Sequence, residues 1–187
     1  MRDPGTWLFP LPAVLVSCQD QESPPNIITL AWAGTVCSDP PMLSISVQPR
    51  RYSHPIIQQT GEFVVNVPRS TQMEAVDYCG MVSGRDVNKF EACGFTPHPS
   101  RYVEVPGILE CPVQLECKVE QTLFLGTHDV FISRIVSVSC DEDILQQGRL
   151  DPMAAQPLVY AMGHYLSVGE VLGRQGVSRG KYGTGHP

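Results

Sequence analysis

The feature that most constrains this chain is a series of short runs rich in β-branched residues, separated by proline and glycine. Such runs are typical of strands. They occur at residues 13–18, 26–37, 42–48, 62–68, 113–126, 129–143, 157–162 and 164–173. Because helical segments do not alternate with them in a sustained way, the pattern predicts an antiparallel barrel rather than a parallel sheet.

Three short helices are expected to pack on this barrel. The first is expected to begin with Ser53 as its cap and to end at Gly61, and the second to begin with Ser70 as its cap. The sequence "NKFEACG" predicts a third helix that ends at Gly94. We expect residues 1–187 to form a single domain. The Gly-rich, polar tail from about residue 174 is expected to be mobile or held by a partner chain.

The composition excludes several classes of protein. A formal net charge of -6 argues against a general binder of nucleic acid or of anionic membranes, which usually presents a net basic surface. The chain contains no apolar run near the roughly 20 residues of a membrane span, and prolines interrupt its N-terminus. We therefore expect no membrane association and a cytoplasmic location.

Cysteine and histidine do not indicate a metal site. The seven cysteines are an odd number without C-x-x-C spacing, and the five histidines are scattered. Most of the cysteines are expected to be small buried hydrophobes, with a redox-active or nucleophilic thiol as the alternative. Motifs of Rossmann folds, P-loops and common hydrolases are absent from the sequence.

Residues 26–41 contain a row of mostly small side chains. In a continuous strand, one face carries Ile27, Thr29, Ala31, Ala33 and Thr35, and the other carries Asn26, Ile28, Leu30, Trp32 and Gly34. The bulkier set suits packing. The smaller set leaves room for a flat ligand, or it is covered by a helix or a second strand.

Two loops carry cations. Arg50, Arg51 and Ser53 lie where a strand is expected to become a helix, and a helix start with guanidinium and hydroxyl groups suits a phosphate. Residues 83–90 form a second polar loop with Arg85 and Lys89. The alternative is that both loops are ordinary solvated turns.

Six motifs, in a fixed order, carry a family resemblance. They are N-I-x-T-x-A-W, S-D-P-P-M-L-S-I-S-V, R-Y-S with G-E-F-V-V-N-V-P, S-G-R-D-V-N-K-F-E, G-T-H-D-V-F-I and P-L-V-Y-x-x-G-x-Y-x-x-x-G. Together they resemble the flavin reductase-like family, and within it the flavoredoxin group. The resemblance runs from about Val14 to Gly169.

The resemblance implies a mainly β fold, an antiparallel split β-barrel of Greek-key type with short flanking helices. It also implies bound FMN and a homodimer with the flavin near the subunit interface. Arg51 and Ser53 match positions that hold the FMN phosphate, and Lys89 matches a second basic residue. The full set of implied cofactor contacts is Asn26, Thr29, Leu30, Ala31, Trp32, Ser46, Gln48, Arg51, Tyr52, Ser53 and Lys89. Cys37 and Ser38 are further candidates.

His128 is the candidate at the reacting side of the flavin. Family members often show G-D-H where this chain has G-T-H-D, so an inherited proton relay is in doubt. Hydride transfer to a flavin needs orientation rather than an enzymic acid or base. We therefore expect His128 to position a substrate or the flavin, or else to be a structural histidine bonded to backbone.

Two functions follow from the resemblance. The first is an NAD(P)H:flavin oxidoreductase that passes electrons from a nicotinamide through FMN to an acceptor. The alternative is a flavoredoxin-like electron-transfer protein with permanently bound FMN and a protein redox partner. A barrel that has lost its flavin is a third possibility, which the presence of Arg51, Ser53 and Lys89 disfavours.

Overall fold

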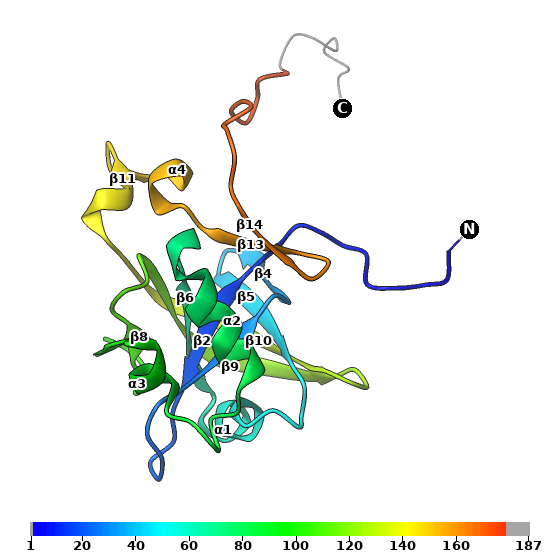
Figure 1. Cartoon of the computed structure of the whole chain (residues 1–187), viewed down its shortest axis with the longest axis vertical. Helices are drawn as coiled ribbons and strands as arrows, with labels where there is room; N and C mark the ends of the chain where they lie inside the picture. The colour runs from blue at the N-terminus through cyan, green and yellow to red at the C-terminus, as the bar shows by residue number, and fades with distance from the viewer. Residues whose placement is uncertain (1, 179–187) are drawn as a thin grey trace.

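A curled seven-stranded sheet forms the body of the protein (Figure 1). The computed structural model describes residues 2–178. The strands follow the spatial order β3 (Asn26–Leu30), β2 (Val14–Cys18), β6 (Glu62–Val67), β9 (Val113–Phe124), β10 (Asp129–Cys140), β5 (Pro41–Val47) and β4 (Ala33–Ser38). All neighbours in this order are antiparallel. The predicted mainly β, antiparallel architecture is confirmed.

The sheet is buried on both faces where β2 and β3 pass. Alternate side chains point to the inside of the curl, where Val16, Ile28, Ile45, Phe63 and Phe131 share one core. The side chains between them point outward into a second core under the helices, which includes Leu15, Ile27, Val76, Phe90 and Ile108. This double burial explains why all five residues of β2 are buried.

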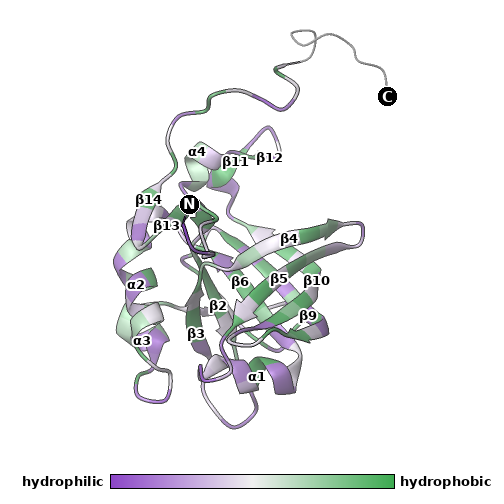
Figure 2. Ribbon diagram, turned by 90° about the vertical axis from the view of Figure 1, so that its right-hand side faces the viewer, coloured by the Kyte–Doolittle hydropathy of each residue, from purple (hydrophilic) through white to green (hydrophobic). Residues whose placement is uncertain are grey.

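Three helices cover the sheet where they were expected. Figure 2 shows α1 (Ser53–Thr60) at one end of the barrel and α2 (Met73–Met81) and α3 (Lys89–Cys93) on the side of β2 and β3. Gly61 and Gly94 end α1 and α3 in the left-handed conformation, with φ of 68° and 66°. None of the helices in residues 2–178 has the length and apolar character needed to cross a membrane.

The two predicted serine caps are wrong. Tyr52 is the residue that precedes α1, and no side chain caps this helix. Ser53 lies within the helix, where its hydroxyl accepts a hydrogen bond from Asn26 Nδ2 at 2.7 Å. Ser70 begins a 3₁₀ turn, η1 (Ser70–Gln72), so α2 starts only at Met73. For Ser53, a bond with the distant Asn26 uses the hydroxyl that was expected to cap the helix.

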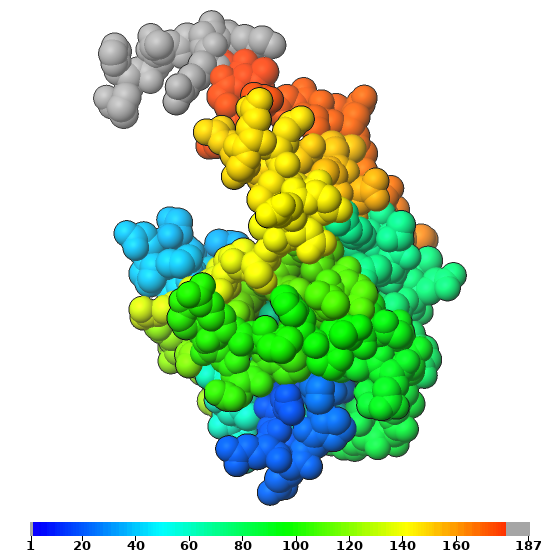
Figure 3. Space-filling view, turned by 90° about the vertical axis from the view of Figure 1, so that its left-hand side faces the viewer, coloured from blue at the N-terminus to red at the C-terminus, as the bar shows by residue number. Residues whose placement is uncertain are grey.

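The remaining elements are short. A small sheet joins β1 (Leu11–Pro12), β13 (Leu158–Ala161) and β14 (His164–Ser167). β7 (Pro97–His98) pairs with β8 (Gly107–Ile108), and β11 (Leu145–Gln146) pairs with β12 (Arg149–Leu150). The second pair lies in sequence between η2 (Glu142–Ile144) and α4 (Pro152–Ala155). Figure 3 shows the green segment after α3 lying across the middle of one face. Most of the tail predicted from about residue 174 lies outside the described residues.

The single strand predicted for residues 26–37 is wrong. The chain bends at Ala31 and Trp32, and β3 and β4 lie at opposite edges of the seven-stranded sheet. The Trp32 carbonyl accepts a hydrogen bond from Ser46 N at 2.9 Å, which starts the pairing with β5. The chain therefore crosses from one edge of the split barrel to the other within two residues.

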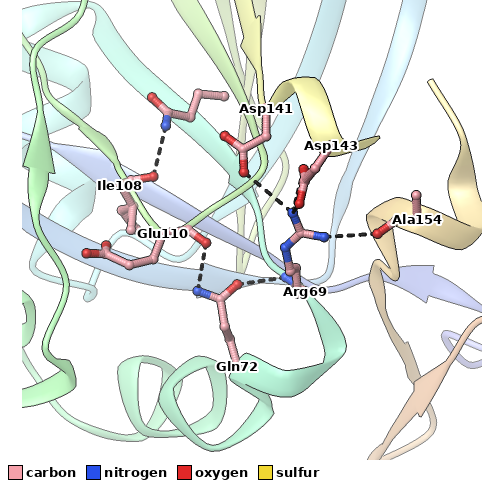
Figure 4. A network of polar contacts seen from close by, with 8 residues as sticks. Arg69, Gln72, Ile108, Glu110, Asp141, Asp143 and Ala154 are labelled. Atoms are coloured by element: carbon pink, nitrogen blue, oxygen red, sulfur yellow. Dashed lines mark hydrogen bonds and ion pairs between the residues drawn. The ribbon is translucent and has the colours of Figure 1, made fainter. Parts of the chain in front are cut away.

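Arg69 joins the C-terminal part of the chain to the sheet (Figure 4). Its guanidinium donates to both carboxylate oxygens of Asp143 at 2.9 Å and to the Ala154 carbonyl at 2.9 Å, and it lies 3.5 Å from Asp141. Its backbone N–H donates to Gln72 Oε1 at 2.7 Å. The Arg69 side chain is 23% exposed, whereas those of Asp141 and Asp143 are 49% and 68% exposed, so the bond to the Ala154 carbonyl is the best shielded from water.

We predict that Arg69→Ala lowers the free energy of unfolding by about 1–2 kcal/mol, mainly because it leaves the partly buried Ala154 carbonyl of α4 without its donor. Urea unfolding measures this. The matched control is Arg134→Ala, which breaks an ion pair with Glu120 on a side chain that is 50% exposed. That change should cost clearly less, because solvent screens an exposed pair. Equal losses in the two variants would contradict a structural role specific to Arg69.

Four cysteines are buried as predicted: Cys18, Cys79, Cys111 and Cys117. Burial raises the pKa of the Cys18 thiol to about 11 and that of the other three to about 12. A thiol whose folded-state pKa is raised keeps its proton while the unfolded chain, with an ordinary value of 9.0, loses it. The stability that these thiols contribute is thus present below about pH 9 and lost as pH rises toward 12.

We predict that Cys117→Ala makes the alkaline loss of stability less steep. Removal of one such thiol should reduce the slope by about 1.4 kcal/mol per pH unit above pH 9. Urea unfolding at several pH values from about 8 to 10.5 measures the slope. Cys140→Ala, which removes an exposed thiol, is the control. An unchanged slope in Cys117→Ala would show that Cys117 does not hold its proton in the folded state.

Candidate functional site

Two adjoining cavities lie along the free edge of β3. The larger has a volume of about 440 Å³ and the smaller of about 320 Å³. Both are lined by Ile28 and Arg51 from the barrel and by Gly80 from α2. A ligand with two chemically different ends can therefore extend from one cavity into the other past Arg51.

The position of β3 at the edge of the sheet shapes the larger cavity. An edge strand has alternate N–H and C=O groups without a strand partner. On the free edge of β3, the Ile27 carbonyl accepts a hydrogen bond from Lys89. In an antiparallel strand every second residue directs its N–H and C=O to the same side, so the next such pair on this edge is that of Thr29. The side chain of Thr29 is not free, because its hydroxyl donates to the Val76 carbonyl of α2. The small face of β3 is thus partly covered by a helix, while Ala31 lines the cavity.

Aromatic rings form two walls of the larger cavity. On one side the rings of Trp32 and His128 have centroids 4.4 Å apart, and on the other Tyr160 and Tyr165 of the β13–β14 hairpin are 5.7 Å apart. Ser46 and Gln48, from β5 and the turn after it, add polar groups. Flat walls with few polar groups suit a planar, partly polar ligand.

His128 stands just before β10, with Nδ1 3.0 Å from the Thr127 hydroxyl. Desolvation, followed by the positive charges of Arg50 and Arg51, lowers the pKa of His128 below its ordinary value of 6.5. The imidazole is therefore neutral at pH 7. A neutral ring with one nitrogen engaged by Thr127 is suited to a hydrogen bond that orients a ligand.

The hairpin wall carries one acid. Asp77 of α2 lines the larger cavity and accepts a hydrogen bond from the Tyr165 hydroxyl at 3.1 Å. Burial, followed by Asp77, raises the pKa of Tyr165 to about 12, so the phenol stays protonated. This bond ties the hairpin to α2 and closes the cavity on that side.

The smaller cavity is cationic. Its lining includes Arg50, Arg51, Arg85 and Lys89 and contains no carboxylate. Ser53 and Ser83 add hydroxyl groups, and the uncapped start of α1 lies at the same place. The ion pairs of residues 2–178 leave the Arg51 guanidinium unpaired. Free cations, hydroxyls and a helix start together form a site for a phosphate-like anion.

Lys89 is buried at the base of this cavity, only 3% exposed. Its ammonium donates to the carbonyls of Ile27 and Cys79, each at 2.7 Å. Desolvation lowers the pKa of Lys89. Since an ammonium has three donors, one N–H remains for an anion. Lys89 therefore joins β3 to the end of α2 while it also contributes to the cavity.

Gly84 allows the loop between α2 and α3 to approach Asn26 and Tyr52. A Cβ at this position would overlap Asn26 Oδ1 and come within 2.7 Å of Tyr52 Cδ1. Arg85, the next residue, places its guanidinium 5.5 Å from the centre of the Tyr52 ring. The glycine thus brings the cationic loop close enough to form one wall of the smaller cavity.

We predict that Gly84→Ala lowers the free energy of unfolding by about 1–3 kcal/mol, because the added methyl has no space beside two packed side chains. The measurement is urea unfolding of the apoprotein. Gly34→Ala is the control, since a Cβ at Gly34 meets nothing within 4 Å. If Gly84→Ala is as stable as Gly34→Ala, the loop is not held against Asn26 as described.

The cofactor contacts that the resemblance implies, together with His128, each line at least one of these cavities. Thr29, Leu30, Ala31, Trp32, Ser46, Gln48 and His128 line the larger, Asn26, Tyr52, Ser53 and Lys89 the smaller, and Arg51 both. Their roles toward a cofactor stay predictions. Cys37 and Ser38 line neither cavity, because they lie at the far end of β4.

The sequence did not indicate several lining residues. Asp77, Gly80 and Met81 of α2 were read as an ordinary helix, and Gly84 as part of a polar loop. Tyr160 and Tyr165 of the β13–β14 hairpin also line the larger cavity. The glycines at 80 and 84, nine and five residues before Lys89, are the one local signal of close approach.

The two cavities together form one extended site. It offers a flat, partly apolar chamber beside a cluster of cations, with a neutral histidine at the chamber wall. Such a site can hold a phosphorylated aromatic cofactor and orient a second reactant against it.

Comparison with known proteins agrees with this geometry. The chain is similar to a flavoredoxin of Desulfovibrio vulgaris (Miyazaki F), with 33% identity and a TM-score of 0.88 over 92% of this chain and 94% of that one. A flavoredoxin from Methanosarcina acetivorans has 31% identity and a TM-score of 0.88 over 95% and 97%. An FMN-binding protein from Thermus thermophilus, solved with bound 1-cyclohex-2-enone, has 26% identity and a TM-score of 0.79 over 93% and 96%.

These neighbours share the split-barrel fold, which confirms the fold expected from the sequence motifs. The model of the flavin reductase like domain matches residues 6–169, which is most of the chain. This protein therefore belongs to the flavin reductase-like family.

Proposed function

We propose that this protein is an FMN-binding oxidoreductase, with the flavin ring in the larger cavity and the phosphate in the smaller. The observation that carries the proposal is the junction of the two cavities at Arg51, one walled by aromatic rings and the other by four cations without an acid. FMN has the same two parts, a planar ring and a phosphate, joined by a short chain. The FMN-binding protein of Thermus thermophilus supports the same assignment.

The residues present fit this cofactor. Arg51, Ser53 and Lys89 would hold the phosphate, with Arg50 and Arg85 adding positive charge. The outward N–H and C=O of Thr29 would bond the polar edge of the ring, which the small side chain of Ala31 leaves accessible. We expected the whole small-residue face of residues 26–35 to lie against a planar ligand. In the present proposal only the free backbone edge of β3 and the side chain of Ala31 do so.

When bound, FMN supplies a ring that accepts hydride and exchanges electrons. The chain's own contribution is orientation. His128 and Trp32 would position a reactant at the open side of the ring, and Tyr160 and Tyr165 would exclude water on the other. Because His128 is neutral at pH 7, it would act through a hydrogen bond and not as a proton source.

We propose NAD(P)H as the electron donor and free flavin or another small molecule as the acceptor. The alternative is a flavoredoxin-like carrier with permanently bound FMN and a protein redox partner, which the similarity to two flavoredoxins favours. Steady-state oxidation of NADH and NADPH separates the two. Turnover with free FMN as acceptor supports the enzyme, and its absence in a protein that holds FMN supports the carrier.

We also propose a homodimer. The N-terminal segment and the chain after β14 extend away from the barrel (Figure 1). They carry large exposed hydrophobic residues, among them Trp7, Leu8 and Phe9 near one end and Val171 and Leu172 near the other. Exposed apolar side chains on extended segments favour burial against a second subunit. Sedimentation that shows a stable, FMN-containing monomer would contradict this.

We predict that Arg51→Ala weakens FMN binding roughly tenfold to a hundredfold, because one charge-assisted contact of about 1.5–3 kcal/mol to the phosphate is lost. Quenching of flavin fluorescence measures the affinity. Riboflavin, which lacks the phosphate, should bind Arg51→Ala and the wild type nearly equally. Equal losses for FMN and riboflavin would show that Arg51 acts on the fold or on the ring and not on the phosphate.

A further inference from the structure

A buried histidine–aspartate pair lies between the two cavities and the barrel core. His54 Nε2 is 2.7 Å from Asp129 Oδ2, and the two side chains are 7% and 8% exposed. Neither residue lines a cavity. The ring of His54 also packs 5.4 Å from that of Phe131 in the core. Burial of a polar pair at this depth costs free energy unless the two side chains stay hydrogen-bonded to each other.

Each member of the pair is next in sequence to a residue of the site. His54 follows Ser53 in the first turn of α1, and Asp129 follows His128 at the start of β10. Since consecutive strand residues point to opposite sides, Asp129 turns into the barrel while His128 faces the larger cavity. The pair therefore connects the backbone that carries Ser53 to the backbone that carries His128.

Further bonds extend this connection to the other walls. Asn26 of β3 donates to the Ser53 hydroxyl at 2.7 Å, and Lys89 of α3 donates to the carbonyl of Ile27, beside Asn26. Backbone pairing of Asp129 with Val47 fixes β10 against β5. These buried hydrogen bonds join α3 to β3 and β3 to α1, and the His54–Asp129 bond joins α1 to β10.

We propose that His54 and Asp129 are positioning residues, which set the separation between the phosphate side of the site at Ser53 and the His128–Trp32 wall. A ligand that must engage both cavities at once gains full affinity only when their spacing matches its length. The part of the proposal that concerns FMN rests on the proposed function. The placement of His128 against Trp32 is a property of the protein alone and can be tested without flavin.

The flavin-free test uses the fluorescence of Trp32. Trp7→Phe leaves Trp32 as the sole tryptophan of the chain, and the emission of an indole depends on the groups in contact with it, here the His128 ring. His54→Leu and Asp129→Ala should each move His128 away from Trp32 and so change the intensity or the maximum of the emission. The double variant should show no larger change than either single variant, because the same bond is removed in all three. Asp129→Asn, whose amide oxygen can still accept from His54, should restore the wild-type emission.

Ile144→Ala is the matched control for lost stability, because Ile144 is fully buried in a separate core cluster with Val113 and Ala155. It should lower the unfolding midpoint as the pair variants do and leave the Trp32 emission unchanged. If His54→Leu and Asp129→Ala also leave the emission unchanged, or if Asp129→Asn behaves like Asp129→Ala, the pair is structural or purely electrostatic and the proposal is overturned.

The flavin test compares FMN with riboflavin in the same variants. His54→Leu should weaken FMN binding about tenfold, a typical effect of breaking one bond of a coupled network, and riboflavin much less. Equal losses for both ligands would overturn the spacing role. If the wild type binds neither flavin, the proposed function fails, and the Trp32 emission still decides whether the pair positions His128.

Discussion

Because the seven-stranded sheet curls without closing, β3 and β4 remain edge strands, and the free side of β3 needs partners that are not strands. Lys89 supplies one by donating to the Ile27 carbonyl. The Thr29 hydroxyl bonds α2 and so brings that helix alongside the same edge. What remains of the edge opens onto the larger cavity. The site is thus a consequence of an open barrel, and a closed one would have used these backbone groups in its own hydrogen bonds.

The clustering of positive charge at the smaller cavity follows from the packing of two loops beside the same edge. The chain is acidic overall, yet four cations meet where the turn before α1 approaches the loop between α2 and α3. Gly84 makes that approach possible, and Lys89 anchors the second loop beneath it. Concentration of positive charge at one point of an acidic protein is expected of an anion site rather than of a general polyanion surface.

Much of the architecture could be predicted from the sequence, because β-branched runs and glycine stops act locally. The strands, the three helices and the ends of α1 and α3 at Gly61 and Gly94 follow from such signals. The break at Ala31 and Trp32 could not be predicted, since the composition is strand-like on both sides and only the curl of the sheet, which brings β3 and β4 to its two edges, requires a bend there. The prediction that Ser53 caps α1 was wrong for a similar reason, because Asn26, which is distant in sequence, forms a hydrogen bond with the Ser53 hydroxyl.

The candidate site divides in the same way. Motif order indicated Arg51, Ser53, Lys89 and His128, and the structure gathers them around adjoining cavities. The roles of Asp77 and Tyr165 could not be predicted from the sequence, because a hydrogen bond between residues 88 positions apart leaves no local pattern. The His54–Asp129 pair was equally hidden, since neither residue type nor spacing relates a helix start to a strand 75 positions later.

The visible absorption spectrum of the purified protein, before and after addition of FMN and removal of the excess, tests the central claim most directly. If the two cavities hold FMN as proposed, the protein retains the two visible bands of a flavin at close to one FMN per chain. A colourless protein that neither retains added FMN nor quenches its fluorescence would contradict the account, and the adjoining cavities would then need another ligand.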